Sequence, residues 1–434
     1  MKKTTKTIIT SAVLAVCAVL FIIGIIVANQ SAEQEYSKNY SIDYELAKVL
    51  SIENNYEVDP DREGNPRGSQ TIEVEVLTGE HKGDVRTILN PLGPSNRKVV
   101  RDGSVLTVKI ETSFGKAGYQ ISITNYNLIP LLIVMIGIFV AAVLIVGRKK
   151  GMMSLIGLTA SLAVIIFFLI PMWLKGNSAT ALTMICCIYI TVLCFTLLGG
   201  ISRKTVSAML GTVLCLFVAY IFAEICSNIA GVSGYSDLMS ADSLLVESRL
   251  LEGITLNIRG LFVAGILISA LGAVMDVAMS IASAVDELRT VNPGMTSREL
   301  FKSGMNVGRD MIGTMTNTLI LAFAGTSLAT MIIMYTANMK PLQLINNDDL
   351  VMEAIRGIAG SLGLITAVPL TAAVASASFG SLGMNPAIPA TQGKGSKTET
   401  APNTERPRKQ LRREMTRIAE EERIKSSGRK NRKE

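Results

Sequence analysis

One carboxylate lies inside a long apolar stretch of the chain. Asp276 occurs in the segment SALGAVMDVAMSIASAVDEL, where Gly272, Asp276, Ser280 and Ala284 recur every four residues. Residues at this spacing share one face of a helix, so the sequence predicts a small, polar face around Asp276. An ionisable group at the centre of a membrane span costs about 2.5–3.5 kcal/mol, which makes it a functional candidate. The chemistry it supports is the binding of a proton or another cation.

Polar side chains also follow one side of the next apolar segment, GRDMIGTMTNTLILAFAGTSL. Thr314 and Thr318 are four residues apart, and Asn317 lies between them. We expect Asp276 to face Thr314, Asn317 and Thr318, which would form a polar cluster inside a helix bundle. Two interpretations stay open: a proton or cation site, or a hydrogen-bonded packing contact between helices.

Glu224 is a weaker site candidate, because it lies about two turns from the end of its apolar stretch, where water can reach it.

Other residue types argue against an enzyme. His81 is the single histidine, and the chain lacks HExxH and GxSxG motifs. We therefore expect no catalytic residues, no bound metal and no cofactor. The six cysteines all lie in apolar runs without CxxC spacing, so we expect them to be core residues.

Eight stretches of the chain are long and apolar enough to cross a membrane. The sequence is 49% hydrophobic and 18% charged, whereas soluble domains carry about 25% charged residues. A spanning helix needs about 20 predominantly apolar residues. The stretches are Ile8–Ala28, Leu128–Val146, Met152–Leu174, Ala179–Leu198, Val206–Ile229, Ile258–Ala284, Met311–Thr336 and Ala354–Phe379. We expect an all-α polytopic membrane bundle of about eight transmembrane helices.

The distribution of Lys and Arg predicts the orientation, because short cytoplasmic connections retain these residues. With the N-terminus inside, the inner segments hold twelve of them: Lys2, Lys3, Lys6, Arg148, Lys149, Lys150, Arg203, Lys204, Arg289, Arg298, Lys302 and Arg309. We therefore expect a plasma-membrane protein with both termini in the cytoplasm. The first stretch also resembles a signal peptide, although its 21 apolar residues exceed the roughly 7–15 that are typical. Its cleavage stays an open alternative.

A polar region of about 100 residues separates the first two apolar stretches and changes to a period of two. Apolar and polar residues alternate in TIEVEVL and in SVLTVKIE, as in half-buried strands. Together with three shorter candidate strands, this pattern predicts a small extracytoplasmic β-rich domain with an OB-like or SH3-like barrel. The shorter strands are expected over Leu46–Ile52, Val85–Leu89 and Tyr119–Ile123. The predicted organisation is a transmembrane helix over 1–28, this domain over 29–126, a seven-helix membrane domain over 127–379 and a basic tail over 380–434.

The tail explains the net charge of the chain. Its 14 Lys and Arg and 7 Asp and Glu account for the whole net charge of +7. We expect a largely disordered cytoplasmic tail, with a charged helix over 406–422, that contacts anionic inner-leaflet lipids at about 1 kcal/mol per surface cation. Glutamates interleave the arginines, which argues against nucleic acid as the partner.

The run from Gly265 to Gly325 resembles the YibE/F-like family of bacterial multi-spanning membrane proteins. The resemblance lies in ALGAVMDVAMSIASAVDEL followed by LFKSGMNVGRDMIGTMTNTLILAFAG, and it extends over about Ile8 to Phe379. It implies an N-terminal span, an external β-rich domain and a membrane bundle, and it implies no particular reaction.

The same region is also similar to resistance-nodulation-division permeases in the order of its features. An acidic residue, Asp276, is followed by an inner amphipathic connection over Ser297–Met305, with Ser297 as its expected cap, and then by the Thr-rich segment Thr314–Thr318. This similarity implies proton coupling at Asp276. The chain differs from those permeases in its number of spans and in its external domain.

Two functional hypotheses follow. The first is a permease or exporter component for an unknown small solute, with a cation-responsive site at Asp276. The alternative is a non-transporting assembly or sensor protein whose external domain binds an envelope partner. Oligomerisation is compatible with both hypotheses.

Overall fold

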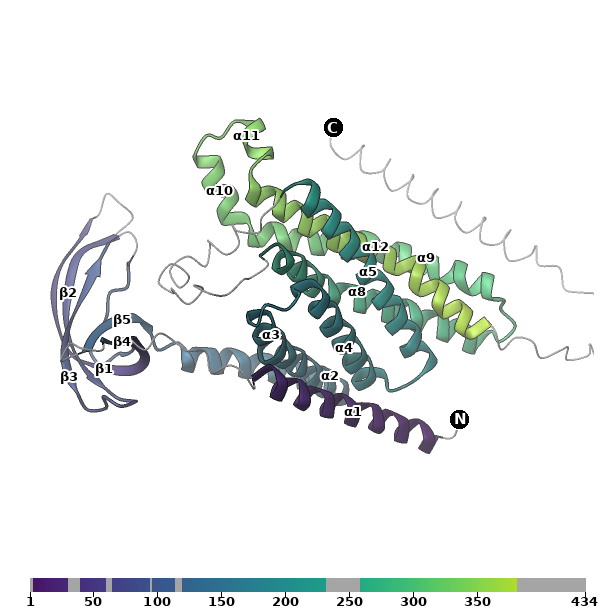
Figure 1. Ribbon diagram of the computed structural model, residues 1–434, viewed down its shortest axis with the longest axis horizontal. Helices are drawn as coiled ribbons and strands as arrows, with labels where there is room; N and C mark the ends of the chain where they lie inside the picture. Colours follow the sequence, from purple (N-terminus) through teal and green to yellow (C-terminus); the bar gives the residue numbers. More distant parts are fainter. Residues whose placement is uncertain are drawn as a thin grey trace, which may run out of the picture. The chain divides into compact units, whose positions relative to one another are not determined.

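The computed structural model describes residues 3–29, 40–59, 65–93, 96–113, 119–231 and 258–380. The predicted basic tail beyond Gly380 lies outside the described residues. The described chain forms long helices and a separate antiparallel sheet (Figure 1). The helices are α1 (Lys3–Asn29), α2 (Ile129–Val164), the π-helix η1 (Ile165–Leu169), α3 (Ile170–Leu174), α4 (Ala179–Gly199), α5 (Arg203–Ile229), α8 (Ile258–Val291), α9 (Ser297–Thr326), α10 (Leu328–Thr336), α11 (Pro341–Ile345) and α12 (Asp348–Gly380).

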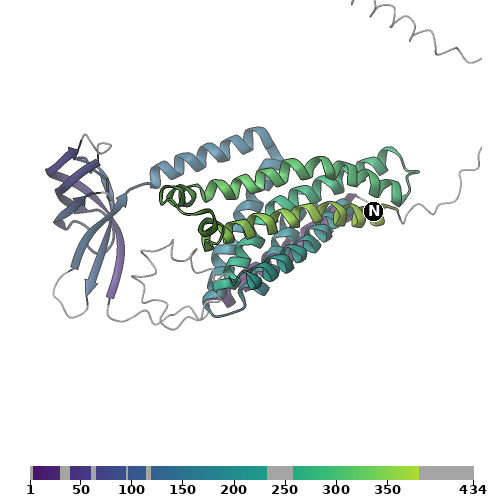
Figure 2. The ribbon, with the colours of Figure 1, turned by 90° about the horizontal axis from the view of Figure 1, so that it is seen from above.

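Six helical segments of the described chain are long and apolar enough to cross a membrane, or seven if α9 and α10 count as one bent span. Where the sequence predicted two spans, Leu128–Val146 and Met152–Leu174, the structure has one helical segment, Ile129–Leu174. This segment is broken at Arg148, whose φ of 47° and ψ of −129° are not helical. Its two parts meet at a sharp bend (Figure 2).

α9 also differs from its prediction, at the N-terminal end of the helix. The predicted interfacial helix over Ser297–Met305 and the start of the following span form one continuous helix. Its N-cap is Thr296 and not Ser297, because the Thr296 side chain accepts a hydrogen bond from the Glu299 backbone N–H. The Glu299 carboxylate in turn accepts one from the Thr296 backbone at 2.8 Å. This capping box begins the helix one residue earlier than expected. At the other end, α9 and α10 meet at an angle of 56°.

Small residues bring α5 and α12 together in the core of the bundle. Both helices carry a small residue at every fourth position, and all of these positions are buried: Ser207, Gly211, Cys215, Ala219 and Ala223 on α5, and Ala359, Gly363, Ala367, Thr371 and Ala375 on α12. Such stripes let two helix backbones approach closely within a membrane. α12 also packs along α8 and α9 and continues through Pro369 (Figures 1 and 2).

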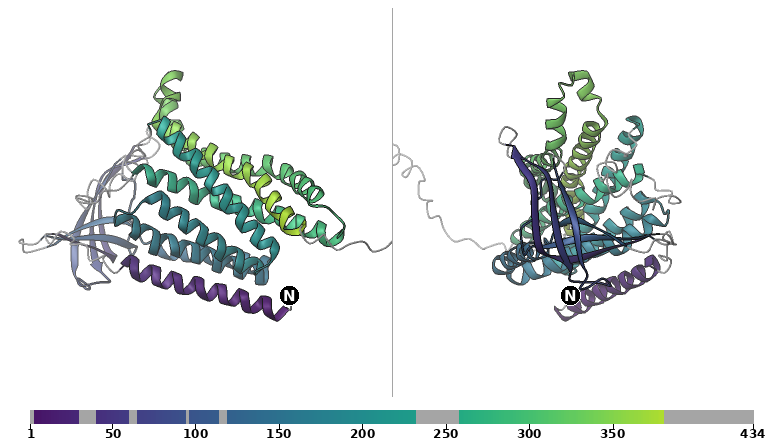
Figure 3. Two further views of the ribbon diagram at one scale, coloured as in Figure 1. Left: turned by 45° about the vertical axis from the view of Figure 1, so that its right-hand side comes forward. Right: turned by 90° about the vertical axis from the view of Figure 1, so that its left-hand side faces the viewer.

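The sheet contains five antiparallel strands in the order β3-β2-β1-β4-β5. Figure 3 shows this sheet in two further views. The strands are β1 (Tyr40–Asp59), β2 (Asn65–Val76), β3 (Val85–Leu92), β4 (Val105–Ser113) and β5 (Tyr119–Tyr126). The predicted alternation is confirmed in β2, where Ile72, Val74 and Val76 are fully buried and the residues between them are not. β1 is much longer than predicted, because backbone pairing with β2 continues through polar residues as far as Asp59.

Side chains bring the two edge strands of the curled sheet together. The Tyr119 hydroxyl of β5 donates a hydrogen bond to Asp84, and Arg86 Nε of β3 donates one to the same hydroxyl at 3.4 Å. His81 stacks on the Tyr119 ring with the ring centroids 4.0 Å apart. Among the described strands, no backbone ladder joins β3 to β5. The OB-like or SH3-like barrel type stays a prediction.

Candidate membrane site

Asp276 lies near the middle of α8, on its exposed side. The span on this helix runs from Arg259 to Val291. The exposed side contains only small or polar residues over its central turns: Gly265, Ser269, Gly272, Asp276 and Ser280. The opposite side is packed, with Val274, Val277 and Ile281 fully buried. The carboxylate is therefore carried by a helix that is well fixed in the bundle.

The polar residues of α9 also lie on an exposed side. Gly313, Thr314, Asn317 and Thr318 are exposed, whereas Gly304 and Gly308 on the other side are buried. The threonines bond to their own helix: Thr314 Oγ1 donates to the Met311 carbonyl at 3.1 Å, and Thr318 Oγ1 donates to the Thr314 carbonyl at 2.9 Å. Such bonds satisfy the hydroxyl donors and leave their oxygens able to accept or to coordinate.

α8 and α9 are neighbours in the bundle. A β-carbon on Gly304 of α9 would lie 3.0 Å from Val285 of α8 and 3.2 Å from Ala372 of α12, so α12 closes the contact between α8 and α9 from one side. Ser280 of α8 and Thr314 of α9 are both exposed. We call the exposed residues here the α8–α9 polar face: Gly265, Ser269, Gly272, Asp276, Ser280, Gly313, Thr314, Asn317 and Thr318.

The structure thus places the predicted residues on neighbouring helices but not inside the bundle. Within the described part of the chain, no hydrogen bond joins Asp276 to Thr314, Asn317 or Thr318. The physical reason is that α12 occupies the inward side of α9, where Met311, Ile312 and Met315 pack against its apolar core. The polar residues of α9 are therefore turned outward, together with Asp276.

Glu224, the weaker candidate, lies at the end of α5 and belongs to an ion pair. Its carboxylate is 3.7 Å from Arg259 Nη2 at the start of α8. It also accepts a hydrogen bond from the Asn228 side chain at 3.3 Å. About a third of each side chain of the ion pair is exposed, so the pair is typical of a half-solvated helix end and not of a buried coupling site.

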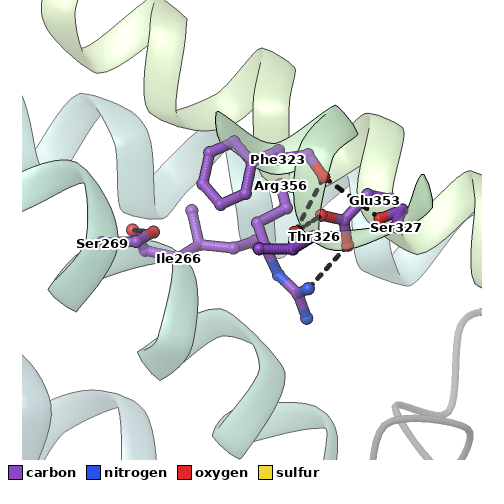
Figure 4. A network of polar contacts seen from close by, with 7 residues as sticks. All are labelled: Ile266, Ser269, Phe323, Thr326, Ser327, Glu353 and Arg356. Atoms are coloured by element: carbon purple, nitrogen blue, oxygen red, sulfur yellow. Dashed lines mark hydrogen bonds and ion pairs between the residues drawn. The ribbon is translucent and has the colours of Figure 1, made fainter. Parts of the chain in front are cut away.

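A second ion pair at the same end of the bundle was not predicted (Figure 4). Arg356 Nη1 donates to Glu353 Oε2 at 2.7 Å, and Thr326 at the end of α9 donates to Glu353 Oε1 at 3.3 Å. The Arg356 guanidinium also lies over the Phe262 ring of α8, 5.3 Å from its centroid. The signal was present in the sequence as opposite charges three residues apart on one helix.

The external sheet has its own polar cluster, at Tyr119. Burial and the hydrogen bond to Asp84 raise the pKa of the Tyr119 phenol, although Arg86 opposes the shift. The same contact with Tyr119 raises the pKa of the Arg86 guanidinium. In the described part of the chain, no three His, Cys, Asp or Glu side chains come together in a way that could hold a metal ion. This cluster joins the two edge strands through side chains.

The family model of the YibE/F-like proteins matches residues 135–381, which is more than half of the chain. The chain belongs to the YibE/F-like family. The match begins within α2 and includes the complete α8–α9 polar face, so this face is part of the YibE/F-like region. No curated protein and no solved structure matches the chain.

Proposed function

We propose that this YibE/F-like protein is a permease or exporter component of the plasma membrane, with a proton- or cation-responsive site at Asp276. The observation that carries the proposal is a carboxylate near the middle of a 33-residue apolar span, on a face without large apolar side chains. A charged group in this position is costly, and such residues mark ion and substrate pathways in membrane proteins.

The neighbouring side chains support this role. Ser280 on the same side of α8, and Thr314, Asn317 and Thr318 on the exposed side of the neighbouring helix α9, carry hydroxyl and amide oxygens. Oxygen ligands of this kind suit a hydrated proton or a small hard cation. The order of acidic helix, amphipathic segment at the start of α9 and Thr-rich segment in the same helix, which is similar to the order in proton-coupled permeases, points to the same chemistry.

The topology that we propose has eight spans and both termini in the cytoplasm. At about 1.5 Å per residue, the 46 residues of Ile129–Leu174 would extend far beyond a hydrocarbon core of about 30 Å. The break at Arg148 is followed by Lys149 and Lys150, as expected of an inner turn between two spans. The tail would then reach anionic lipids of the inner leaflet.

Cation flux into proteoliposomes tests the function. The purified protein is reconstituted with a pH-sensitive dye inside, and proton entry is followed after a membrane potential is applied, with and without Na⁺ or K⁺. We expect flux above that of empty liposomes, which Asp276→Asn abolishes and Asp286→Asn, a change near the inner end of the same helix, leaves intact. Equal rates for the unmodified protein, Asp276→Asn and empty liposomes would contradict the proposal.

One observation favours the alternative, a non-transporting assembly protein. The edge strand β3 exposes Val85 at 48% and Leu89 at 63%, and an edge strand with exposed apolar side chains is a template for pairing with another chain. Under this alternative, deletion of residues 29–126 would remove a reproducible cross-linked envelope partner, and Asp276→Asn would leave that partner in place.

A further inference from the structure

Exposed residues on two helices of the same bundle differ sharply in kind. On α5 the exposed side consists of large apolar residues at helical spacing: Val206, Leu210, Leu214, Phe217, Ile221 and Ile225. Such a side is suited to lipid tails. On α8 the corresponding positions are Gly265, Ser269, Gly272, Asp276 and Ser280. The exposed side of α8 therefore lacks the side chains with which α5 meets lipid, whereas on α9 the exposed polar residues are followed by Ile320 and Leu321.

The glycines of this face pack against no other atom of the described residues. A β-carbon on Gly265, Gly272 or Gly313 would meet no atom within 4 Å. In contrast, a β-carbon on Gly308 would lie 2.2 Å from Val368, so packing explains that glycine. Glycine inside a helix costs about 0.5–1 kcal/mol relative to alanine. Open glycines in a membrane span are accounted for when a helix from outside the chain approaches closely.

We propose that a second copy of this chain covers the α8–α9 polar face. The face is complementary to itself, because it contains a carboxylate acceptor, Asp276, and amide and hydroxyl donors, Asn317 and Ser280. In a two-fold interface, each contact occurs twice, once in each direction between the two copies. Each Asp276 would therefore face hydrogen-bond donors of the other copy and lose its contact with lipid. The dimer would enclose the two Asp276 carboxylates that the proposed function requires. The contact between the two copies would form whether or not the protein transports a solute.

Disulfide cross-linking in native membranes tests the contact. Ser280→Cys is a nearly isosteric change within the face, and Gly272→Cys provides a second position. The matched control is Leu214→Cys on the exposed side of α5. Leu214 is adjacent to Cys215, and a β-carbon on Gly363 of α12 would lie 3.7 Å from the Cys215 carbonyl and 3.8 Å from Val274 of α8, so the depth of Leu214 is close to that of Asp276. The unmodified chain, whose six cysteines are free, is the background.

We expect an oxidant to convert most of the Ser280→Cys and Gly272→Cys proteins into covalent dimers of the chain, and to leave the Leu214→Cys and unmodified proteins monomeric. Two differently tagged copies should co-purify, and Gly272→Leu should reduce this recovery at least tenfold. Monomers at both cysteine positions, equal cross-linking at Leu214, or an adduct with a different protein would each overturn the proposal. Because the readout is contact, failure here would leave a flux that depends on Asp276 unaffected.

Discussion

Gly211 of α5 lies directly against Thr371 of α12: a β-carbon on Gly211 would stand 2.2 Å from Thr371 Oγ1 and 3.1 Å from its Cα. This contact belongs to the two small-residue stripes that join these helices. A hydroxyl next to a glycine α-carbon is typical of close helix packing in membranes, where weak Cα–H···O contacts accompany dispersion. The bundle that presents the α8–α9 polar face therefore depends on residues that are small and not merely apolar.

We expect Gly211→Ala to destabilise the protein by about 1–3 kcal/mol, because the added methyl group forces two helix backbones apart. The measurement is thermal unfolding of the purified protein in detergent. Gly325→Ala is the matched control, since its added methyl group meets no atom within 4 Å and alanine favours the helix by about 1 kcal/mol. Equal losses for the two variants would show that the α5–α12 contact is looser than described.

Gln70 is the centre of a buried amide network in the external sheet. Its Nε2 donates to Asn54 at 2.7 Å and to the Val100 carbonyl at 3.1 Å, and its Oε1 accepts from the Val100 backbone at 2.8 Å and from Asn90 at 3.2 Å. Gln70→Leu would leave these partners unpaired, at about 1–3 kcal/mol for each buried group. We expect hydrogen exchange at the Val100 amide to accelerate at least tenfold, while the exposed change Thr87→Ala leaves it unchanged. Unaltered protection at Val100 would contradict the network.

The Tyr119 phenol predicts a loss of stability in alkali. Because burial and Asp84 raise its pKa above the usual value of about 10, the folded sheet holds this proton more tightly than the unfolded chain does. This contribution is complete below about pH 10 and is lost as the pH rises through the raised pKa. We expect Tyr119→Phe to flatten the decline in hydrogen-exchange protection of β5 between about pH 9 and 11. Tyr44→Phe, at a tyrosine that is 54% exposed, should keep the decline. A decline that persists in Tyr119→Phe would assign it to another group.

The two ion pairs at the same end of the bundle should differ in their contributions to stability. Only 13% of the Glu353 side chain and 21% of the Arg356 side chain are exposed. Glu353→Gln replaces a charged hydrogen bond and should therefore cost about 1.5–3 kcal/mol. Glu224→Gln disrupts the longer, more exposed pair with Arg259 and should cost less than about 1 kcal/mol. Thermal unfolding of the two variants side by side gives the comparison, and a larger loss for Glu224→Gln would reverse our assignment.

The periodicity of the sequence predicted which residues share one face of a helix or strand, but it did not predict what packs against that face. The four-residue spacing of Gly272, Asp276 and Ser280 correctly placed them on one side of a helix. It could not show whether that side faces inward, since this depends on which sides of α8 are covered by α4, α5, α9 and α12. The spacing of Ile72, Val74 and Val76 likewise predicted a buried strand face. The end of β1 was missed, because polar residues such as Asn54 pair through the backbone and show no alternation.

Labelling with dicyclohexylcarbodiimide tests the role of Asp276 most directly, because this reagent modifies protonated carboxyl groups in apolar surroundings. The protein is treated in lipid vesicles at several pH values, with and without Na⁺, and modified peptides are identified by mass spectrometry. We predict adduct formation at Asp276 that decreases when the pH or the Na⁺ concentration is raised, and no adduct at this position in Asp276→Asn. Labelling of Asp276 that is independent of both pH and Na⁺, or no labelling of it at any pH, would contradict a proton- or cation-responsive site.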